Sequence, residues 1–439
     1  FGTFEENPLS KNLVQPPGHD PTAYPTYYGS IGGSYGNYGL RFGAMIKYDD
    51  EVVYKRERFL LAAAPASSSP VLVNVEDFGA KSGGSDDTEA FKEAWKEACA
   101  SSSEVSFVVP KNKMYLLKPI TFSGPCKSQI SVKIYGTIEA SKDQSDYEDR
   151  RHWLVFSNLE NLQVDGGGTI NGNGKIWWKK SCKIDKNQPC TSAPTALAFY
   201  ECNNLVVDGI VMRNAQQMHL VFQKCVNVRA SNLLVTAPGN SPNTDGIHVT
   251  QTQNIQIKSC TIKTGDDCIS IVSGSKRVQA LDITCGPGHG ISIGSLGNGN
   301  QEAHVSEVVV NRAKLSGTMN GVRIKSYQGG SGSAKNIQFQ NVAMYNVSNP
   351  IIIDQYYCDK TSKCPTEESA VQVKDVVYKN IRGSSSTEFG IKLNCSNTHP
   401  CRGIVLQDIN LVREGNGKIK AACESVQMET RGSVSPKCS

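Results

Sequence analysis

The feature that most constrains the fold of this chain is a short repeat that runs through its central and C-terminal parts. An asparagine opens each copy and a β-type run follows it, at Asn161, Asn204, Asn227, Asn254 and Asn336, with irregular copies near Val308, Val376 and Ile404. The spacings cluster at roughly 22 to 30 residues apart from some longer inserts, which is the period of one rung in a solenoid. Leucine-rich repeats share this period, but their helical half-repeat and leucine pattern are missing. Short strands joined by Gly, Asn and Ser turns therefore predict an all-β chain folded as a right-handed, single-stranded parallel β-helix, with asparagines that stack and hydrogen-bond at successive bends.

A single amphipathic helix is predicted before the repeats. Residues 71–80 read as a strand with alternating apolar residues, and residues 86–99 read as a helix that Asp86 or Asp87 can cap. One stripe of this helix is apolar, formed by Phe91, Ala94, Trp95 and Ala98. Because the first rung of a solenoid would otherwise expose its apolar face and strand edges, we expect this helix to cap the N-terminal end.

Residues 1–70 differ in composition from the rest of the chain. Tyr, Gly and Pro cluster there without either hydrophobic period, which predicts a poorly ordered leader. Residues 55–70 contain a basic stretch, an apolar run of about six residues and a Pro/Ser linker. A cleavable prosequence and a flexible extension both fit this pattern. We therefore divide the chain into a leader, residues 1–70, and a β-helix domain, residues 71–439.

The charge of the chain excludes some partners and suits others. A formal net charge of +5 on 439 residues is too small to indicate nucleic-acid binding. The leader holds six Lys/Arg and seven Asp/Glu, so residues 71–439 carry about +6. This mildly cationic domain suits a polyanionic substrate, although ordinary solubilising charge explains it equally well. No apolar run approaches the roughly 18 residues of a membrane span, so we expect no membrane anchor.

The cysteines predict an oxidising compartment. There are 15 of them, and several could close short loops, Cys182 with Cys190, Cys358 with Cys364, Cys395 with Cys401 and Cys423 with Cys438. No C-x-x-C pair is present, which argues against a zinc ribbon. Two N-glycosylation triplets, at Asn346 and Asn394, agree with secretion. We expect a secreted, extracellular protein.

Four short polar motifs fall at the same phase of the repeat. They contain Asp245, the pair Asp266 and Asp267, His289, and the pair Arg323 and Lys325. Neighbouring motifs up to His289 are 21 to 23 residues apart, about one rung each. Since rungs stack about 4.8 Å apart, side chains of equal phase should meet on one face.

This set of residues suits the hydrolysis of an acidic glycan. Three crowded carboxylates repel one another, so at least one should have a raised pKa and carry the proton that a general acid needs, while the others act as base. His289 lies between glycines and can tune or transfer a proton. Arg323 and Lys325 are two apart on a predicted strand, so both can reach the carboxylate of an acidic sugar. Taken singly, each motif also fits a plain turn or a solvated strand edge; their common phase favours a site.

The motif blocks resemble a known family. Residues 241–249 (SPNTDGIHV), 264–271 (TGDDCISI), 285–295 (CGPGHGISIGS) and 322–326 (VRIKS) are similar, in this order, to the signatures of the glycoside hydrolase family that contains the polygalacturonases. Residues 75–91 and 165–178 resemble its plant members. The likeness covers about residues 71–439, which it implies to be the catalytic domain.

The resemblance implies a role for each site residue. Asp266 is the general acid, Asp245 and Asp267 hold the attacking water, and His289 supports proton transfer. The substrate-binding set is Arg323, Lys325, Asn243 and a tyrosine, for which Tyr357 matches better than Tyr356. The family inverts the anomeric centre, which requires two carboxyl groups separated widely enough for a water molecule. A tryptophan is frequent after the R-I-K-[ST] block, and here Tyr327 departs from that pattern.

Some cysteine positions also resemble the family. The implied disulfides are Cys268–Cys285, Cys395–Cys401 and Cys423–Cys438, and the remaining Cys202, Cys225 and Cys260 are expected as buried thiols in the coil.

The predicted function is therefore endo-acting hydrolysis of the α-1,4-galacturonosyl linkages of polygalacturonate, the homogalacturonan of pectin. The alternatives are exo-action, rhamnogalacturonan or xylogalacturonan hydrolysis on the same fold, a calcium-dependent pectate lyase, and an inactive pectin-binding wall protein. We expect a monomer of the cell wall or apoplast that needs neither cofactor nor metal.

Overall fold

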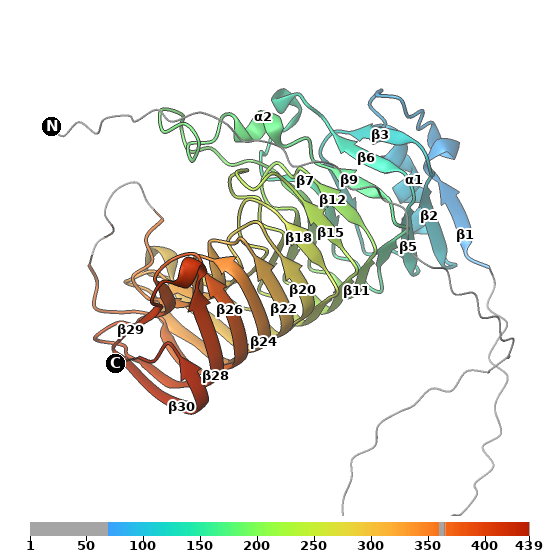
Figure 1. Cartoon of the computed structure of the whole chain (residues 1–439). Coiled ribbons are helices and arrows are strands. Elements are labelled where there is room, and N and C mark those ends of the chain that lie inside the picture. Colours follow the sequence, from blue (N-terminus) through green and yellow to red (C-terminus); the bar gives the residue numbers. More distant parts are fainter. Residues whose placement is uncertain (1–68, 360–363, 365, 439) are drawn as a thin grey trace, which may run out of the picture. The chain divides into compact units, whose positions relative to one another are not determined.

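The computed structural model describes residues 69–359, 364 and 366–438. Nearly the whole predicted leader lies outside these residues, so its character stays a prediction. The described chain is a stack of short strands, and every pairing between its named strands is parallel (Figure 1). The predicted right-handed parallel β-helix is confirmed.

Two sheets wrap around the coil. The larger has 19 strands: β1 (Val71–Asn74), β2 (Val105–Val109), β3 (Met114–Leu117), β5 (Ile130–Ile134), β6 (Thr137–Ala140), β8 (Gln163–Asp165), β9 (Thr169–Asn171), β11 (Asn203–Asp208), β12 (Val211–Arg213), β14 (Val226–Ser231), β15 (Leu234–Thr236), β17 (Gln253–Lys258), β18 (Thr261–Lys263), β20 (Lys276–Cys285), β22 (Glu302–Ser316), β24 (Ser331–Val347), β26 (Gln372–Ser385), β28 (Cys401–Arg413) and β30 (Val426–Ser435). The smaller has 11: β4 (Ile120–Ser123), β7 (His152–Ser157), β10 (Thr195–Tyr200), β13 (Leu220–Gln223), β16 (Ile247–Thr250), β19 (Ile269–Ile271), β21 (Ile291–Leu296), β23 (Asn320–Ser326), β25 (Asn349–Asp354), β27 (Phe389–Asn394) and β29 (Lys420–Glu424).

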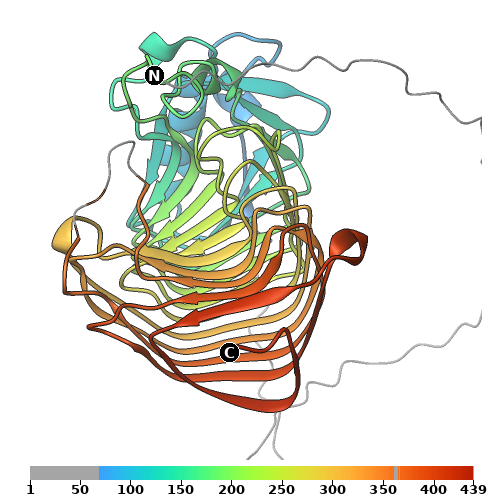
Figure 2. The same ribbon diagram turned by 60° about the vertical axis from the view of Figure 1, so that its left-hand side comes forward.

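The larger sheet bends along its length. From β2 to β18 each rung contributes two short strands to it, whereas β20 runs through both positions and pairs with β17 at one end and with β18 at the other. Figure 2 shows these rungs stacked one over the next toward the C-terminal end. The smaller sheet receives one strand from each of the central rungs, and it carries the candidate site.

The opening asparagines of the repeat form a ladder at one bend. The Nδ2 atoms of Asn204, Asn227 and Asn254 donate to the Oδ1 atom of the asparagine one rung earlier, over 3.1, 3.0 and 2.7 Å. These residues have φ between 53° and 58°, a left-handed conformation that asparagine tolerates better than most residues. The predicted stacking of asparagines is confirmed, and it fixes the register of the rungs.

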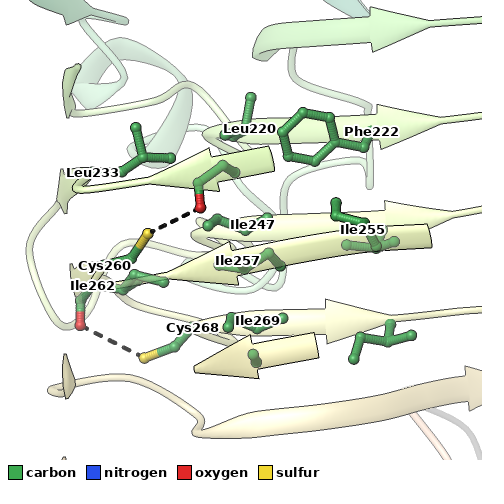
Figure 3. Close-up of a cluster of buried hydrophobic side chains, with 14 of the residues drawn as sticks. Leu220, Phe222, Leu233, Ile247, Ile255, Ile257, Cys260, Ile262, Cys268 and Ile269 are labelled. Atoms are coloured by element: carbon green, nitrogen blue, oxygen red, sulfur yellow. Dashed lines mark hydrogen bonds between the residues drawn. The ribbon is translucent and has the colours of Figure 1, made fainter. Parts of the chain in front are cut away.

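The core fills the space between the sheets. Figure 3 shows it at the central rungs, where isoleucine, leucine and cysteine side chains of successive strands lie over one another. Four phenylalanines on neighbouring strands of the smaller sheet stack with ring centroids 4.8 to 5.5 Å apart, Phe122, Phe156, Phe199 and Phe222. Because the stack repeats at nearly the strand spacing, the aromatic packing and the β ladder reinforce each other.

The predicted cap is helix α1 (Thr88–Ala100). Its four predicted apolar residues are buried, and the Trp95 ring packs edge-on against Phe122 of the first rungs. Asp86 accepts a hydrogen bond from the Thr88 backbone over 3.0 Å, while Asp87 occupies the N-cap position and accepts from the Lys81 backbone. Of the two aspartates allowed by the sequence, Asp87 is the N-cap residue, without a side-chain cap hydrogen bond, and Asp86 precedes it. The other helical pieces are short, α2 (Lys175–Trp178) and 3₁₀ turns at Val75–Phe78, Gln144–Asp146, Asn298–Asn300 and Glu414–Asn416.

Six disulfides cross-link the chain. Five are the pairs named from the sequence, Cys182–Cys190, Cys268–Cys285, Cys358–Cys364, Cys395–Cys401 and Cys423–Cys438. The sixth, Cys99–Cys126, was not predicted, because its 27-residue separation gives no short-loop signal. The expected buried thiols, Cys202, Cys225 and Cys260, are confirmed. None of the helices in the described part of the chain is long and apolar enough to span a bilayer.

Candidate active site

Three of the predicted catalytic side chains stand at one register position of the smaller sheet. Strands β16, β19 and β21 pair in register at their first isoleucines. Asp245, Asp267 and His289 each precede that isoleucine by two residues, and Asp266 adjoins Asp267 in the turn. Since adjacent strands lie about 4.8 Å apart, consecutive rungs bring these groups together. The predicted common phase is confirmed for these three motifs, whereas Arg323 of the fourth motif pairs in register with Ser292, three residues past the position of His289.

Asp266 and His289 are joined by a hydrogen bond. The Nδ1 atom of His289 lies 2.9 Å from Oδ1 of Asp266. Burial alone would raise the pKa of Asp266, but the hydrogen bond and the charges of His289 and Lys325 outweigh it and leave this pKa lowered. Burial would lower the pKa of His289, and the bond to Asp266 raises it instead. When one proton is present on the pair, these shifts place it on the histidine side.

Asp267 is held by the two cations of β23. Arg323 Nη2 lies 2.8 Å from its Oδ1 and Lys325 Nζ lies 3.0 Å from its Oδ2. Ser292 also donates to Oδ1, over 2.8 Å. Asp267 is only 2% exposed, so this buried carboxylate requires such partners. The prediction that Arg323 and Lys325 project to one face is confirmed, and both also neutralise a carboxylate.

The negative charge of Asp245 is compensated less strongly than that of Asp267. Ser270 donates to its Oδ2 over 2.9 Å, and the Nδ1 atom of His248 lies 3.9 Å from the same oxygen. Burial and the negative charge of Asp266 raise the pKa of Asp245. We expected crowding to raise the pKa of at least one carboxyl group, and Asp245 is that group. The pKa of Asp266 is lowered instead, although the resemblance gives Asp266 the role of the acid.

Glycines make room for the close approach of the turns. A side chain on Gly290 would bring its Cβ within 2.1 Å of the Asn320 carbonyl oxygen, and one on Gly265 within 2.0 Å of the Ser241 oxygen. Gly290 also has a φ of +88°, in the left-handed region. These positions hold His289 and Asp266 beside the rungs that follow and precede them.

The site lies in a cleft with a volume of about 550 Å³. Its lining includes all four predicted catalytic residues together with Asn243, Arg323, Lys325 and Tyr357. Tyr357 lies under the Lys325 ammonium at 5.1 Å and packs edge-on against Tyr327 at 5.2 Å, so Tyr327 adjoins a tyrosine that lines the cleft. Asn243 Nδ2 donates to Asp266 Oδ2 over 3.4 Å. The structure brings every predicted site residue into this one cleft.

Sequence reasoning missed a second row of polar groups. Ser270 and Ser292 occupy the middle position of the I-S-I segments and link the aspartates to His248 and Arg323, over 2.6 Å and 3.0 Å. Both serines are almost fully buried. A hydroxyl between two core isoleucines on consecutive rungs is the signal that would have identified them.

The cleft also contains groups of the kind that bind metals. One ligand atom each from Asp266, Asp267 and His289 lies within 4.8 Å of the others. The hydrogen bonds of Asp267 to two cations and of Asp266 to His289 already use part of this donor capacity. Such a donor set poorly fits a resident metal ion, because side-chain partners already compensate the negative charges of Asp266 and Asp267 that would bind the ion.

Comparison with known proteins agrees with this geometry. Residues 99–435 match the model of the glycosyl hydrolases family 28. A polygalacturonase from Malus domestica is 58% identical over 425 residues, 96% of this chain and 90% of that protein. The polygalacturonase QRT2 from Arabidopsis thaliana is 60% identical over 373 residues, 84% of this chain and 85% of that protein. The solved polygalacturonase from Erwinia carotovora ssp. carotovora has the same fold, with a TM-score of 0.68 at 21% identity over 84% of this chain and 99% of that one. The chain is thus a glycoside hydrolase, and it belongs to glycosyl hydrolases family 28.

Proposed function

We propose that this protein hydrolyses the α-1,4-galacturonosyl linkages of polygalacturonate, the homogalacturonan of pectin. The observation that carries the proposal is the cleft itself, in which a cluster of aspartates and a histidine adjoins Arg323, Lys325 and Tyr357. Carboxylates supply acid and base to a glycosidic bond, and fixed cations favour a sugar with a carboxylate of its own.

The proposed acid and base roles follow from the different partners of the three aspartates. Asp266 delivers a proton to the leaving oxygen, and His289, whose raised pKa keeps a proton on the pair, supplies it through their hydrogen bond. Asp245 and Asp267 act as base and hold the attacking water. Because no side chain attacks the sugar in this scheme, the anomeric configuration is inverted.

Substrate binding uses donors that the internal ion pairs leave free. A lysine ammonium has three N–H donors, and Lys325 uses one of them on Asp267. Arg323 gives its Nε to Ser292 and its Nη2 to Asp267, which leaves further guanidinium donors. Tyr357 offers a ring face to the sugar, and Asn243 reaches the substrate beside Asp266.

Internal cleavage is the proposed mode of action. A second hollow, of about 190 Å³, shares Pro242 and Asn243 with the cleft and extends it toward Trp177 and Trp178. A groove that continues past the reacting bond accommodates sugar units on that side of the cut, which suits a chain bound away from its end.

The protein is further proposed to be a secreted monomer of the plant cell wall. Six disulfides support an oxidising compartment. One chain supplies all the candidate site residues, so function does not require a second subunit. The acceptor Asn346 is exposed, as a glycosylated asparagine must be.

Product analysis tests this function. Polygalacturonate should yield new reducing ends, a rapid fall in mean chain length, and an initial product with the β-anomeric signal in proton NMR. Asp266→Asn serves as the control and should lower kcat by about 10²- to 10⁴-fold, the usual contribution of a general acid. If galacturonate monomer were the only product, the proposed endo-action would be wrong and the enzyme would be exo-acting. Faster cleavage of rhamnogalacturonan or xylogalacturonan would reassign the substrate.

A further inference from the structure

An ion pair joins two loops that are far apart in the sequence. Lys183 Nζ lies 2.6 Å from Asp359 Oδ1, across a separation of 176 residues. Lys183 lies between α2 and β10, and Asp359 follows β25. Both residues line the catalytic cleft together with Asp245, Asp266 and Asp267.

The contact spans the catalytic rungs. Five strands of the smaller sheet lie between β10 and β25, in the order β13, β16, β19, β21 and β23. At about 4.8 Å a strand, the two rungs are about 29 Å apart along the helix axis. The loops that carry Lys183 and Asp359 must therefore extend toward each other across the rungs of Asp245, Asp267 and His289.

A disulfide-bonded cysteine adjoins each charged residue of the contact. Lys183 directly follows Cys182, which is bonded to Cys190, and Asp359 directly follows Cys358, which is bonded to Cys364. Closing such small loops reduces the conformational freedom that a contact between them would otherwise cost. The disulfide from Cys182 to Cys190 thus restrains the loop that presents Lys183.

We infer that the Lys183–Asp359 pair is a strap over the catalytic cleft that holds a bound polysaccharide chain between successive cuts and so determines the pattern of products. This inference rests on the proposed function and adds to it. Ile184, 57% exposed, lines the same cavity beside Lys183 and gives the strap an apolar face toward the sugars.

The strap must also open, and its exposure permits this. The two side chains are 43% and 48% exposed, and such ion pairs are weak and screened by salt. A long polymer can therefore enter when the pair separates. Closure over the bound chain slows its escape, so one encounter gives several cuts.

Charge reversal separates a strap from a simple substrate contact. The variants are Lys183→Glu, Asp359→Lys and the double exchange, each made also with Asp266→Asn so that binding is measured without turnover. Lys183→Glu and Asp359→Lys should each accelerate dissociation of polygalacturonate by up to about fivefold, the range expected for an exposed pair. The double exchange should return the rate to within about twofold of the parent.

The Asp359→Lys result is the most informative. The added positive charge should by itself slow the release of a polyanion, so faster release from this variant identifies loss of the strap. Slower release from Asp359→Lys, with no recovery in the double exchange, would instead make Lys183 a plain substrate contact and overturn the proposal. Unchanged rates in all three variants would overturn it as well.

A pulse-chase assay links the strap to catalysis. Active enzyme is started on labelled polygalacturonate, excess unlabelled polymer is added, and the labelled cuts made after the addition are counted. The single variants should make fewer such cuts than the parent and the double exchange should recover them; equal counts would refute the strap. Absence of hydrolysis by the parent would refute the proposed function, whereas the dissociation rates still decide the strap.

A matched control is available on the larger sheet. Lys276 and Glu307 form a pair of 3.2 Å with exposures of 48% and 42%, on β20 and β22. Lys276→Glu and Glu307→Lys change the same charges outside the cleft and should leave dissociation and product pattern unchanged. Equal effects from this pair would show that net charge alone governs retention and would overturn the strap.

Discussion

His289 Nδ1 and Asp266 Oδ1 lie 2.9 Å apart, and this contact raises the pKa of the histidine while lowering that of the acid. The proton needed by the leaving group is thus stored on the pair rather than on an isolated carboxyl group. A raised histidine pKa keeps that proton available at a higher pH than a lone aspartic acid would.

We predict that His289→Gln moves the alkaline limb of the kcat profile to lower pH. In the parent, the pair loses its proton as pH rises through the raised pKa of His289. In the variant, Asp266 alone must hold the proton and loses it earlier. Measuring kcat against pH for both proteins tests this, and an unmoved alkaline limb would remove His289 from proton delivery.

Asp245→Asn should abolish turnover and raise thermal stability at neutral pH. Burial and Asp266 raise the pKa of Asp245, so its ionised form is disfavoured in the folded state. This cost is absent below the unfolded pKa of about 3.9 and grows as pH rises above it. The gain in Tm should therefore be larger at pH 7 than at pH 4. A uniform loss of stability at both values would contradict the assigned cause.

Lys325→Met should destabilise the fold through Asp267. Removing one of two cations leaves a buried carboxylate less compensated, with an expected cost of about 1–3 kcal/mol because Arg323 remains. In the double variant Asp267→Asn/Lys325→Met the cost should be smaller than the sum of the single effects. Urea unfolding of all four proteins measures this coupling, and additive effects would deny it. Lys276→Met, at an exposed pair, should change stability by less than about 0.5 kcal/mol.

Activity should persist after removal of divalent metal ions. The two cations on Asp267 take the place that a metal would have beside the carboxylates. Dialysis against EDTA should leave the release of reducing ends unchanged, with no ultraviolet absorbance from unsaturated products. Loss of activity that calcium restores, accompanied by such absorbance, would point to elimination by a lyase.

The sequence predicted the β-helix, its capping helix and the common phase of the catalytic motifs because each depends on local periodicity. A repeat of about one rung places Asp245, Asp267 and His289 in register wherever the strands pair in order. The asparagine ladder followed from the same regularity.

Contacts outside this periodicity could not be predicted. The hydrogen bonds of Asp267 to Arg323 and Lys325 depend on side-chain reach, so a pair expected to bind substrate is found also to hold a carboxylate. The Lys183–Asp359 pair joins irregular loops, for which the repeat sets no register. The lowered pKa of Asp266 reflects its partner, which a count of nearby acids does not reveal.

The successive rungs of β16, β19, β21 and β23 deliver carboxylates, an imidazole and two cations, so the spacing of the site is set by the strand ladder itself. Insertion of one additional coil between Asp266 and His289 would separate them by about 4.8 Å more and break their bond. The same insertion beyond β25 would leave that bond untouched. Lengthening of the protein is therefore tolerated at its ends and forbidden across these few turns.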